Sequence, residues 1–348
     1  MRRNNMRKNK IKVLITDDSL LFRNMLKNQL SQDSDIEVVG LAADPVEAME
    51  KIKTLNPDIV TLDIEMPIMD GITFIKKLMA ERPTKVVLVS SMNISVFDAL
   101  QSGALDFVRK PTATYGLEAF IKELKTKIKV ASIAKLISYD LKTKDTEVPK
   151  KEITKLRKTS TKIIAIGAST GGTEAILKVI KELPKTTPPI LITQHMPPGF
   201  TKMYADRLNR ICTMEVREAT NAMRLKPGLA LVAPGDKHME LKKDKEGYYV
   251  RCREGEKVSG HCPSVDVLFD SVAEVAGKNS VGIILTGMGR DGASGLMKMK
   301  EAGALTIGQD EKTSVVYGMP MVAYNIGAVE IQLPIENIST TLIRHLNK

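Results

Sequence analysis

Short apolar runs alternate with amphipathic helical patterns along most of this chain, and the alternation occurs in two series. The apolar runs are typical of buried strands, and the segments between them place apolar residues three or four positions apart, as one face of a helix requires. Units in which a helix follows a strand build parallel sheets with helices on both faces. We therefore expect an α/β protein with two doubly wound parallel-sheet domains, and 348 residues are enough for two hydrophobic cores.

The first series spans residues 10–130 and predicts one domain of five strand–helix units. Its expected strands are 12–17 (KVLITD), 36–42 (IEVVGLA), 58–63 (DIVTLD), 85–91 (KVVLVSS) and 106–111 (DFVRKP). Its expected helices are 20–30, 45–55, 71–80, 95–104 and 117–131. The apolar periodicity is then lost, clearly so from about Ser138, in a stretch rich in Lys and Thr, so we place a linker at 131–159.

The second series lies within residues 160–348 and predicts the other domain. Its expected strands are 162–168 (KIIAIGA), 188–195 (PPILITQH), 280–287 (SVGIILTG) and 304–310 (ALTIGQD). Its expected helices are 174–183, 200–211, 265–277 and 293–303. The stretch between about 213 and 258 indicates β-hairpin structure, with DKEG (244–247) as a turn.

The charge distribution and the aromatic content argue against nucleic acid as a partner. The formal net charge is +11, but much of the excess lies at the extreme N-terminus and between Lys122 and Lys162, where a charged run is usually a solvated face. Only 4% of residues are aromatic and there is no Trp, so few side chains are available to stack on bases. Attraction to an acidic protein surface stays open.

Cysteine usage and the N-terminal sequence predict a cytoplasmic protein. Three separated cysteines (Cys212, Cys252 and Cys262) suit a reducing compartment, and they lack the paired spacing of a zinc site. The sequence has no apolar run of about 18 residues, and its basic N-terminus lacks the apolar region of a secretory signal, so we expect no membrane insertion. Met6 is a candidate alternative start.

Polar side chains follow the expected strands of the first domain. Asp17 and Asp18 follow the first strand, Asp63 the third, Ser90 the fourth and Lys110 the fifth. The loops after parallel strands gather at one edge of the sheet, where ligands bind. Three carboxylates there suit a hard cation such as Mg²⁺, and an Asp beside Mg²⁺ can attack phosphorus to give an aspartyl phosphate. The alternative, in which strand-end Asp residues only cap helices and form turns, explains one Asp better than all five residues together.

The runs TDDS, LDIEMPIMDG, VSS and FVRKP resemble those of two-component receiver domains, over residues 10–130. The resemblance implies a flavodoxin-like fold in which Asp63 is the phosphoacceptor and binds Mg²⁺ together with Asp17 and Asp18. It also implies that Ser90 is the switch hydroxyl and that Lys110 contacts the phosphoryl group. Receiver domains are usually phosphorylated by a partner histidine kinase.

The segment IIAIGASTGG places Gly167, Ser169 and Gly171 between an expected strand and an expected helix. This GxSxG pattern is that of a nucleophile elbow, in which a tight turn exposes the serine and the helix N-terminus offers amides to an anion. The pattern alone is weak, because small Gly/Ser turns follow many strands. A P-loop is disfavoured because Thr173 replaces its Lys, and a dinucleotide fingerprint because Ser169 replaces its middle Gly.

A serine needs an adjacent base to act as a nucleophile, and the sequence has four histidines. His195 ends the expected strand ILITQH, which should lie beside the strand that precedes Ser169. His345 lies in the terminal helix. His238 and His261 lie in polar loops, where an ordinary solvated side chain is the simpler interpretation. We therefore expect His195 to be the base.

A carboxylate must hold the imidazole of such a base in the right tautomer. Asp291 follows the apolar strand at 280–287, in the glycine-rich loop GMGRDG, whose glycines allow close approach of the backbone. We expect it to be the third member of a triad. The alternative is that Asp291 only caps the helix at 293–303, although one residue can do both.

The motifs GASTGG, QHMPPGF, APGDKH, CPSVDVLF and GMGRDG together resemble the catalytic domain of the chemotaxis protein-glutamate methylesterases, the CheB family, over residues 160–345. The resemblance implies a Rossmann-like domain with Ser169, His195 and Asp291 as catalytic residues, in a chain order unlike that of the α/β-hydrolases. It also implies the Met288 amide as an oxyanion donor. The Thr170 amide, next after the nucleophile, is a geometric addition.

By this resemblance the chain is a phosphorylation-activated serine hydrolase that removes methyl esters from glutamates of methyl-accepting chemotaxis receptors and deamidates receptor glutamines, with no cofactor for the ester chemistry. From the two-domain layout we expect the unphosphorylated first domain to pack over the serine site. Two alternatives stay open. One is a non-catalytic response regulator whose second half binds protein or DNA, although no helix-turn-helix pattern is present. The other is a serine hydrolase of another ester or amide.

Overall fold

The computed structural model describes residues 9–66, 69–91, 95–112, 115–136 and 162–347. The chain divides between residues 140 and 141 into two compact units, each built around its own sheet. The predicted domain boundaries stay predictions, and the candidate start at Met6 and residues 137–159 of the predicted linker lie outside the described residues. Within the described ranges, no helix is both long enough and apolar enough to cross a membrane.

The first unit contains a five-stranded parallel sheet. Its strands are β1 (Ile11–Thr16), β2 (Ile36–Ala42), β3 (Ile59–Leu62), β4 (Lys85–Ser90) and β5 (Asp106–Arg109). They lie in the order β2-β1-β3-β4-β5, the flavodoxin-like order whose ligand site is beside β1 and β3. The five predicted strands are confirmed, and their ends differ from the predicted ends by no more than two residues.

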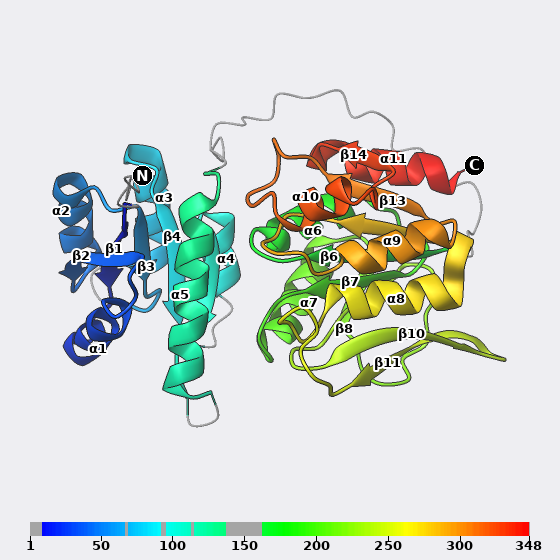
Figure 1. Ribbon diagram of the computed structural model, residues 1–348, viewed down its shortest axis with the longest axis horizontal. Helices are drawn as coiled ribbons and strands as arrows, with labels where there is room; N and C mark the ends of the chain where they lie inside the picture. The colour runs from blue at the N-terminus through cyan, green and yellow to red at the C-terminus, as the bar shows by residue number, and fades with distance from the viewer. Residues whose placement is uncertain (1–8, 67–68, 92–94, 113–114, 137–161, 348) are drawn as a thin grey trace, which may run out of the picture. The chain divides into compact units, whose positions relative to one another are not determined.

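Five helices cover this sheet (Figure 1). They are α1 (Leu20–Leu30), α2 (Pro45–Leu55), α3 (Gly71–Glu81), α4 (Ser95–Gln101) and α5 (Leu117–Ile133). Ser19, Asp44 and Asp70 accept hydrogen bonds from first-turn amides of α1, α2 and α3, which fixes where these helices begin. α4 ends three residues earlier than predicted, and α5 continues to Ile133, inside the range predicted as a linker.

The second unit contains a seven-stranded parallel sheet and a separate antiparallel hairpin. The sheet strands are β6 (Ile163–Ala168), β7 (Ile190–Gln194), β8 (Glu215–Glu218), β9 (Leu229–Val232), β12 (Ser280–Ile284), β13 (Leu305–Gln309) and β14 (Ile331–Leu333). The hairpin strands are β10 (His238–Asp244) and β11 (Gly247–Arg253). The sheet order is β14-β13-β12-β6-β7-β9-β8, in which six strands follow the Rossmann order and β8 is added at one edge.

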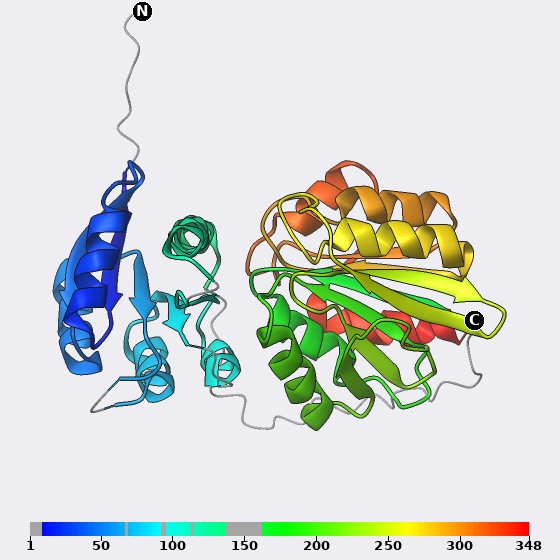
Figure 2. The same cartoon turned by 90° about the horizontal axis from the view of Figure 1, so that it is seen from below.

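Helices cover both faces of this second sheet, as Figure 2 shows. They are α6 (Gly172–Ile180), α7 (Phe200–Ile211), α8 (Val265–Ala276), a short 3₁₀ helix (Gly277–Asn279), α9 (Ala293–Glu301), α10 (Met319–Asn325) and α11 (Ile335–Leu346). α8 and α9 lie on one face, and α6 and α7 on the other (Figure 2). Apolar side chains of the sheet, α8, α9 and the hairpin form one buried cluster, which includes Leu241, Phe269 and Leu296. The expected pair of doubly wound α/β domains is confirmed.

The stretch 213–258 differs in part from the predicted hairpin. β10 and β11 form that hairpin, with the turn at 244–247 as expected. β8 and β9 instead join the main sheet in parallel. All four residues of β9 are buried, so the strand has no alternating pattern, and only tertiary structure decides its partner. No helix is predicted at 319–325, where α10 forms, because seven residues are too few to show a helical period.

Candidate active site

Three neighbouring strands at the centre of the second sheet lead to the predicted triad. Ser169 follows β6, His195 follows β7, and the loop with Asp291 follows β12 on the other side of β6. β6 therefore lies where the strand order reverses, and ligands of doubly wound sheets bind at this point, beyond the carboxyl ends of the strands. The prediction that the strands before Ser169 and His195 lie side by side is confirmed.

His195 and Asp291 are in direct contact. Nε2 of His195 lies 2.7 Å from Oδ2 of Asp291, and both side chains are largely buried. Burial raises the pKa of Asp291, but the hydrogen bond and charge of His195, together with two backbone amides, outweigh burial and lower that pKa to about 2. The carboxylate is thus ionised at neutral pH and can only accept, so Nε2 carries the proton. Nδ1 is left as the basic nitrogen of the neutral ring.

The pairing of β6 with β7 places Ser169 beside His195 at the edge of the sheet, but no hydrogen bond links the Ser169 hydroxyl to Nδ1 of His195. Nδ1 of His195 is buried and has no hydrogen-bond partner among the described residues. Ala168 pairs with Gln194 in the register of β6 and β7, and the amide of His195 donates to the carbonyl of Ala168 at 3.2 Å. Ser169 and His195 therefore occupy matching positions just beyond two paired strands. Ser169 is partly exposed, as a nucleophile that meets substrate must be.

Asp291 binds the N-terminus of α8, not that of the helix that follows it in sequence. Its Oδ2 accepts from the amide of Val265 at 2.8 Å. Its Oδ1 accepts from the amide of Asp266 at 3.0 Å and from Oγ of Ser264 at 2.7 Å. α9 begins after Gly292 and has no side-chain cap, so the interpretation of Asp291 as the cap of that helix is wrong. The positive end of the α8 dipole helps to keep the carboxylate ionised.

Two glycines allow the elements that carry the triad to pack closely against one another. A Cβ atom at Gly167 would lie 2.2 Å from Cγ1 of Val265, so only glycine lets the start of α8 reach the end of β6. A Cβ atom at Gly287 would lie 2.7 Å from Cβ of Ser169, and the amide of Ser169 donates to the carbonyl of Thr286 at 3.0 Å. The loop after β12 therefore packs directly against the turn that holds Ser169.

Gln194 fixes the backbone on both sides of the site and was missed by sequence reasoning. Its Nε2 donates to the carbonyl of Ser169 at 2.9 Å and to the carbonyl of His195 at 3.2 Å. One buried amide thus ties the turn of the candidate nucleophile to the turn of the candidate base. The only signal for this role is its polar character at the end of a buried strand, directly before His195.

The two predicted oxyanion donors are the amides of Thr170 and Met288. Thr170 is next to Ser169 in sequence, and Met288 is next to Gly287, which packs against Ser169. The carbonyl of Thr170 accepts from Oγ1 of Thr286 at 3.0 Å. The Met288 side chain is 42% exposed. The use of their amides as oxyanion donors stays a prediction.

Two of the remaining histidines are not the solvated side chains that their polar loops suggest. The ring of His261 stacks on that of His195, with centroids 3.6 Å apart and planes inclined by 10°. His238 is buried, and its Nδ1 accepts from the amide of Ser264 at 3.2 Å, while its Nε2 lies 2.9 Å from the carbonyl of Glu256. His345 lies in α11, as expected.

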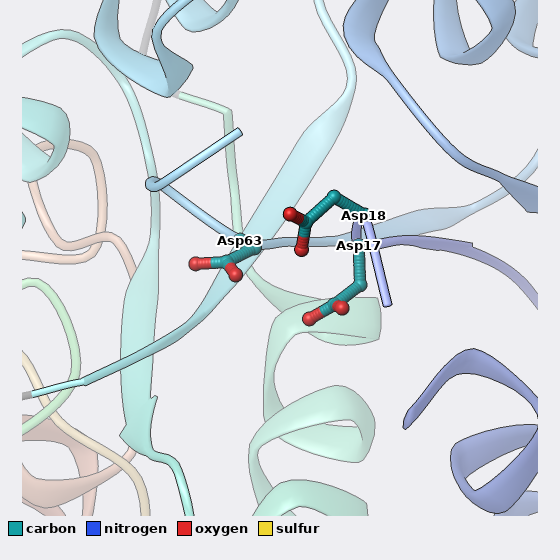
Figure 3. A group of neighbouring side chains, drawn as sticks. All are labelled: Asp17, Asp18 and Asp63. Atoms are coloured by element: carbon teal, nitrogen blue, oxygen red, sulfur yellow. The ribbon is translucent and has the colours of Figure 1, made fainter. Parts of the chain in front are cut away.

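Three carboxylates meet at the predicted strand ends of the first unit (Figure 3). Asp17, Asp18 and Asp63 each offer one oxygen, and these atoms lie within 4.8 Å of one another. Asp17 and Asp63 are buried, whereas Asp18 is exposed. Mg²⁺ prefers oxygen ligands and usually keeps several waters, so a cluster of carboxylates that is open to solvent on one side fits this ion.

Lys110 and Ser90 complete this cluster. Nζ of Lys110 lies 2.5 Å from Oδ2 of Asp63 and 2.8 Å from Oδ2 of Asp17. Burial raises the pKa of Asp63 despite the ion pair with Lys110. Burial also disfavours the Lys110 ammonium, but its two carboxylate partners outweigh this and raise the pKa of Lys110. Ser90 ends β4, its carbonyl accepts from the Lys110 amide at 2.8 Å, and its buried Oγ has no hydrogen-bond partner in the described ranges.

Comparisons with known proteins match both units. The family model described as CheB methylesterase matches residues 164–342, and the response regulator receiver domain model matches residues 13–122. A protein of Syntrophomonas wolfei named protein-glutamate methylesterase/protein-glutamine glutaminase 2 is 51% identical over 99% of this chain and 100% of its own length. A protein of Sulfurimonas denitrificans named protein-glutamate methylesterase/protein-glutamine glutaminase is 48% identical over 97% of this chain and 99% of its own.

A solved structure agrees with these matches. The crystal structure of the Thermotoga maritima CheB methylesterase catalytic domain covers 53% of this chain and 99% of that one, at 40% identity and a TM-score of 0.52. The first family match includes the strands that lead to Ser169, His195 and Asp291, and the second includes the carboxylate cluster. The chain therefore belongs to the CheB methylesterase family and carries an N-terminal response regulator receiver domain.

Proposed function

We propose that this chain removes methyl esters from protein glutamates and deamidates protein glutamines, with Ser169 as the nucleophile. The observation that carries the proposal is the 2.7 Å contact between Nε2 of His195 and Oδ2 of Asp291, beside the turn that holds Ser169. A hydroxyl, an imidazole and a carboxylate in series are the groups that acyl transfer to serine requires. The names of the two curated relatives give the same two reactions.

In the first half-reaction, Oγ of Ser169 attacks the γ-carbonyl carbon of the methylated glutamate while Nδ1 of His195 takes the hydroxyl proton. Asp291 stabilises the resulting imidazolium and keeps a proton on Nε2. The C–OCH₃ bond then breaks, Nδ1 returns its proton to the departing oxygen, and methanol leaves. The base is Nδ1 because Nε2 is held by Asp291, which reverses the roles of the two ring nitrogens in chymotrypsin-type triads.

In the second half-reaction, Nδ1 of His195 takes a proton from water, whose oxygen attacks the acyl carbon. The bond from that carbon to Oγ of Ser169 then breaks, Nδ1 returns the proton to Oγ, and the glutamate leaves. A glutamine substrate follows the same course, with ammonia as the leaving group. Both tetrahedral intermediates carry a negative oxygen. The amides of Met288 and Thr170 would donate to it, and removal of one such donor typically costs about 3 kcal/mol of transition-state stabilisation.

In the receiver, Asp63 would accept a phosphoryl group from a chemotaxis histidine kinase. Mg²⁺, held by Asp17, Asp18 and Asp63, would neutralise charge on the transferring phosphoryl group. Lys110 already contacts Asp63, and its ammonium would turn to the new phosphoryl oxygens. The buried hydroxyl of Ser90 would contact the same group. The ester chemistry needs no cofactor, because the nucleophile, base and oxyanion donors are all groups of the chain.

The proposed substrates are methyl-accepting chemotaxis receptors, in glutamate-rich helical regions exposed to the cytoplasm. An acidic substrate matches the net charge of +11. We place the enzyme in the cytoplasm, without nucleic acid as a partner. Regulation would come from the receiver, which would inhibit the serine site until Asp63 is phosphorylated. A chain that begins at residue 151 should then show higher basal esterase activity than the full chain, and an inert truncated chain would contradict this inhibition.

The test of the function measures methanol released from methylated receptor membranes, with and without a small phosphodonor. We expect release that depends on Ser169 and increases with phosphorylation. A phosphonate probe tests the chemistry without the receptor, because only an activated serine is labelled. Labelling of Ser169 without methanol release would indicate a hydrolase of another ester or amide, and absence of both would indicate a non-catalytic regulator.

A further inference from the structure

Two sequence motifs that supply no triad member contact each other at Ser264, and one of them also reaches the carboxylate of Asp291. CPSVDVLF contains Ser264, whose Oγ lies 2.7 Å from Oδ1 of Asp291, the oxygen opposite to the one that faces His195. APGDKH contains His238, whose Nδ1 accepts the amide hydrogen of Ser264 at 3.2 Å. Ser264 is completely buried, and His238 is 1% exposed. Because both side chains are buried, they can act only through the protein groups that they contact.

The short segment that ends at Ser264 also contacts the base. The ring of His261 lies parallel to the ring of His195, with centroids 3.6 Å apart. The backbone of His261 is held independently of this stack, because its amide donates to the carbonyl of Val258 at 2.9 Å and the Val258 amide donates back at 3.0 Å. One face of the His195 ring is thus covered by the His261 ring, and the backbone of His261 is held by hydrogen bonds to Val258.

We propose that the segment His261–Ser264 is a positioning element of the active site, in which Ser264 holds the carboxylate of Asp291 and His261 holds the ring plane of His195. This proposal rests on the proposed esterase function and adds residues to it. Neither residue takes part in bond making. Together they would hold the Asp291 carboxylate and the His195 ring in the orientation that catalysis by Ser169 requires.

Four hydrogen bonds hold the carboxylate of Asp291 in one orientation. Oδ2 of Asp291 accepts from Nε2 of His195 and from the amide of Val265, while Oδ1 accepts from Oγ of Ser264 and from the amide of Asp266. Rotation of the carboxylate would break all four bonds. Of these four bonds, two come from backbone amides and two from the side chains of His195 and Ser264, so the Ser264 bond can be removed without altering the backbone.

The orientation of Ser264 is itself determined. The carbonyl of Glu256 can only accept, so Nε2 of His238 carries the proton and Nδ1 must accept from the Ser264 amide. Oγ of Ser264 also accepts from the amide of Val267 at 3.4 Å, as the N-cap of α8. Its hydroxyl hydrogen therefore remains for Asp291. Helix capping and carboxylate positioning are two roles of one hydroxyl, and a test must separate them.

The separating experiment compares Ser264→Ala and Ser264→Gly with Ser271→Ala in the full chain. Glycine is nearly as good an N-cap as serine, so Ser264→Gly removes the donor to Asp291 with little loss of capping. Ser271 is a buried serine on the same helix that accepts from Leu241 and donates to Leu268, without contact to the triad. We expect both Ser264 variants to lower kcat about tenfold at unchanged KM, the effect of one hydrogen bond to a charged group. We expect Ser271→Ala to lower Tm and to leave kcat unchanged.

A second readout does not depend on turnover. The proton between Nε2 of His195 and Asp291 should give a protected downfield NMR signal in chain labelled with ¹⁵N-histidine, assigned by its loss in His195→Gln. We expect this signal to broaden or shift in both Ser264 variants and to stay unchanged in Ser271→Ala. If the loss of kcat is proportional to the loss of Tm in all three variants, and the NMR signal is unchanged in both Ser264 variants, then Ser264 is only a helix cap and the proposal is overturned.

Two variants test the role of His261: one removes its ring, and the other replaces it with a phenyl ring. His261→Ala should lower kcat about tenfold at unchanged KM, because the base loses the surface that fixes its plane. His261→Phe should restore most of kcat, because a flat ring is retained without its nitrogens. A Phe variant as slow as the Ala variant would overturn the stacking role. If wild type itself releases no methanol, the proposed function fails, whereas the NMR signal still decides the positioning of Asp291.

Discussion

Nε2 of His195 lies 2.7 Å from Oδ2 of Asp291, and the same carboxylate binds the first amides of α8. The orienting residue of the proposed triad is therefore also the contact that joins α8 to the loop after β12. Gly167 and Gly287 allow this close packing, because a Cβ atom on either would collide with Val265 or with Ser169. A substitution of Asp291 should therefore change both the catalytic rate and the stability of the second unit.

Replacement of Ser169 by Ala should abolish methanol release, with a loss of kcat of about 10⁴-fold or more. The turn should be preserved, because backbone bonds from Ser169 to Thr286 and from Gly172 to Ser169 hold it. Methanol release from receptor membranes and the thermal melt of the variant are the two measurements. Retained turnover in a correctly folded variant would exclude Ser169 as the nucleophile.

Asp291→Asn should lower kcat by about 10⁴-fold, because an amide that donates to His195 stabilises the wrong tautomer. In the wild type, Nε2 carries the proton and Nδ1 is free to act. The variant should show the opposite arrangement in ¹⁵N NMR of the imidazole nitrogens. An unchanged tautomer together with full activity would contradict the proposed use of Nδ1.

The stabilising contribution of Asp291 should disappear in acid. Its pKa in the folded protein is lowered to about 2, below the value of about 3.9 that an Asp has in an unfolded chain. Because the folded-state value is the lower one, the contribution is complete above about pH 5 and is lost as the pH falls through about 2; it amounts to about 2–3 kcal/mol. The difference in free energy of unfolding between wild type and Asp291→Asn should therefore shrink by about 2–3 kcal/mol over this range. Urea melts at a series of pH values measure it, and a constant difference would refute it.

Gln194→Glu should destabilise the second unit by about 1–3 kcal/mol and lower kcat, because a carboxylate oxygen would face two carbonyl oxygens with no hydrogen between them. The carbonyls concerned are those of Ser169 and His195. Gln332→Glu is the matched control, since its partner is the hydroxyl of Tyr317, which can rotate and donate. Equal effects of the two changes on Tm and kcat would argue against a special role for Gln194.

Removal of Mg²⁺ with EDTA should block phosphorylation of the chain by a small phosphodonor and leave the basal esterase rate unchanged. The three carboxylates that fit the ion lie in the first unit, whereas the ester chemistry uses Ser169 and His195 in the second. Asp63→Asn should likewise prevent phosphate incorporation. Asp33→Asn, in an ion pair with Lys129, should not. Loss of basal activity on chelation would place a metal requirement in the esterase itself.

Local patterns in the sequence predicted most of the secondary structure and most of the candidate site. Apolar runs placed the strands of the first unit within two residues, because a strand buried on both faces needs a continuous apolar segment. Ser169, His195 and Asp291 stood out because each follows such a strand. The same pattern did not predict that β8 and β9 join the main sheet. Each is only four residues long, and the sequence of so short a strand does not indicate which strand it pairs with.

The amino-acid sequence alone predicts the alternation of strands and helices and the polar residues at the strand ends. The position of β12 beside β6, on the side opposite to β7, comes from tertiary structure. This position lets Asp291 contact His195, although the two residues are 96 positions apart in the sequence. Tertiary structure also decided that Ser264, Gln194 and His261 contact the triad. The physical reason is that periodicity reports which face of an element is buried, whereas strand order and side-chain contacts depend on packing between segments that no local pattern encodes.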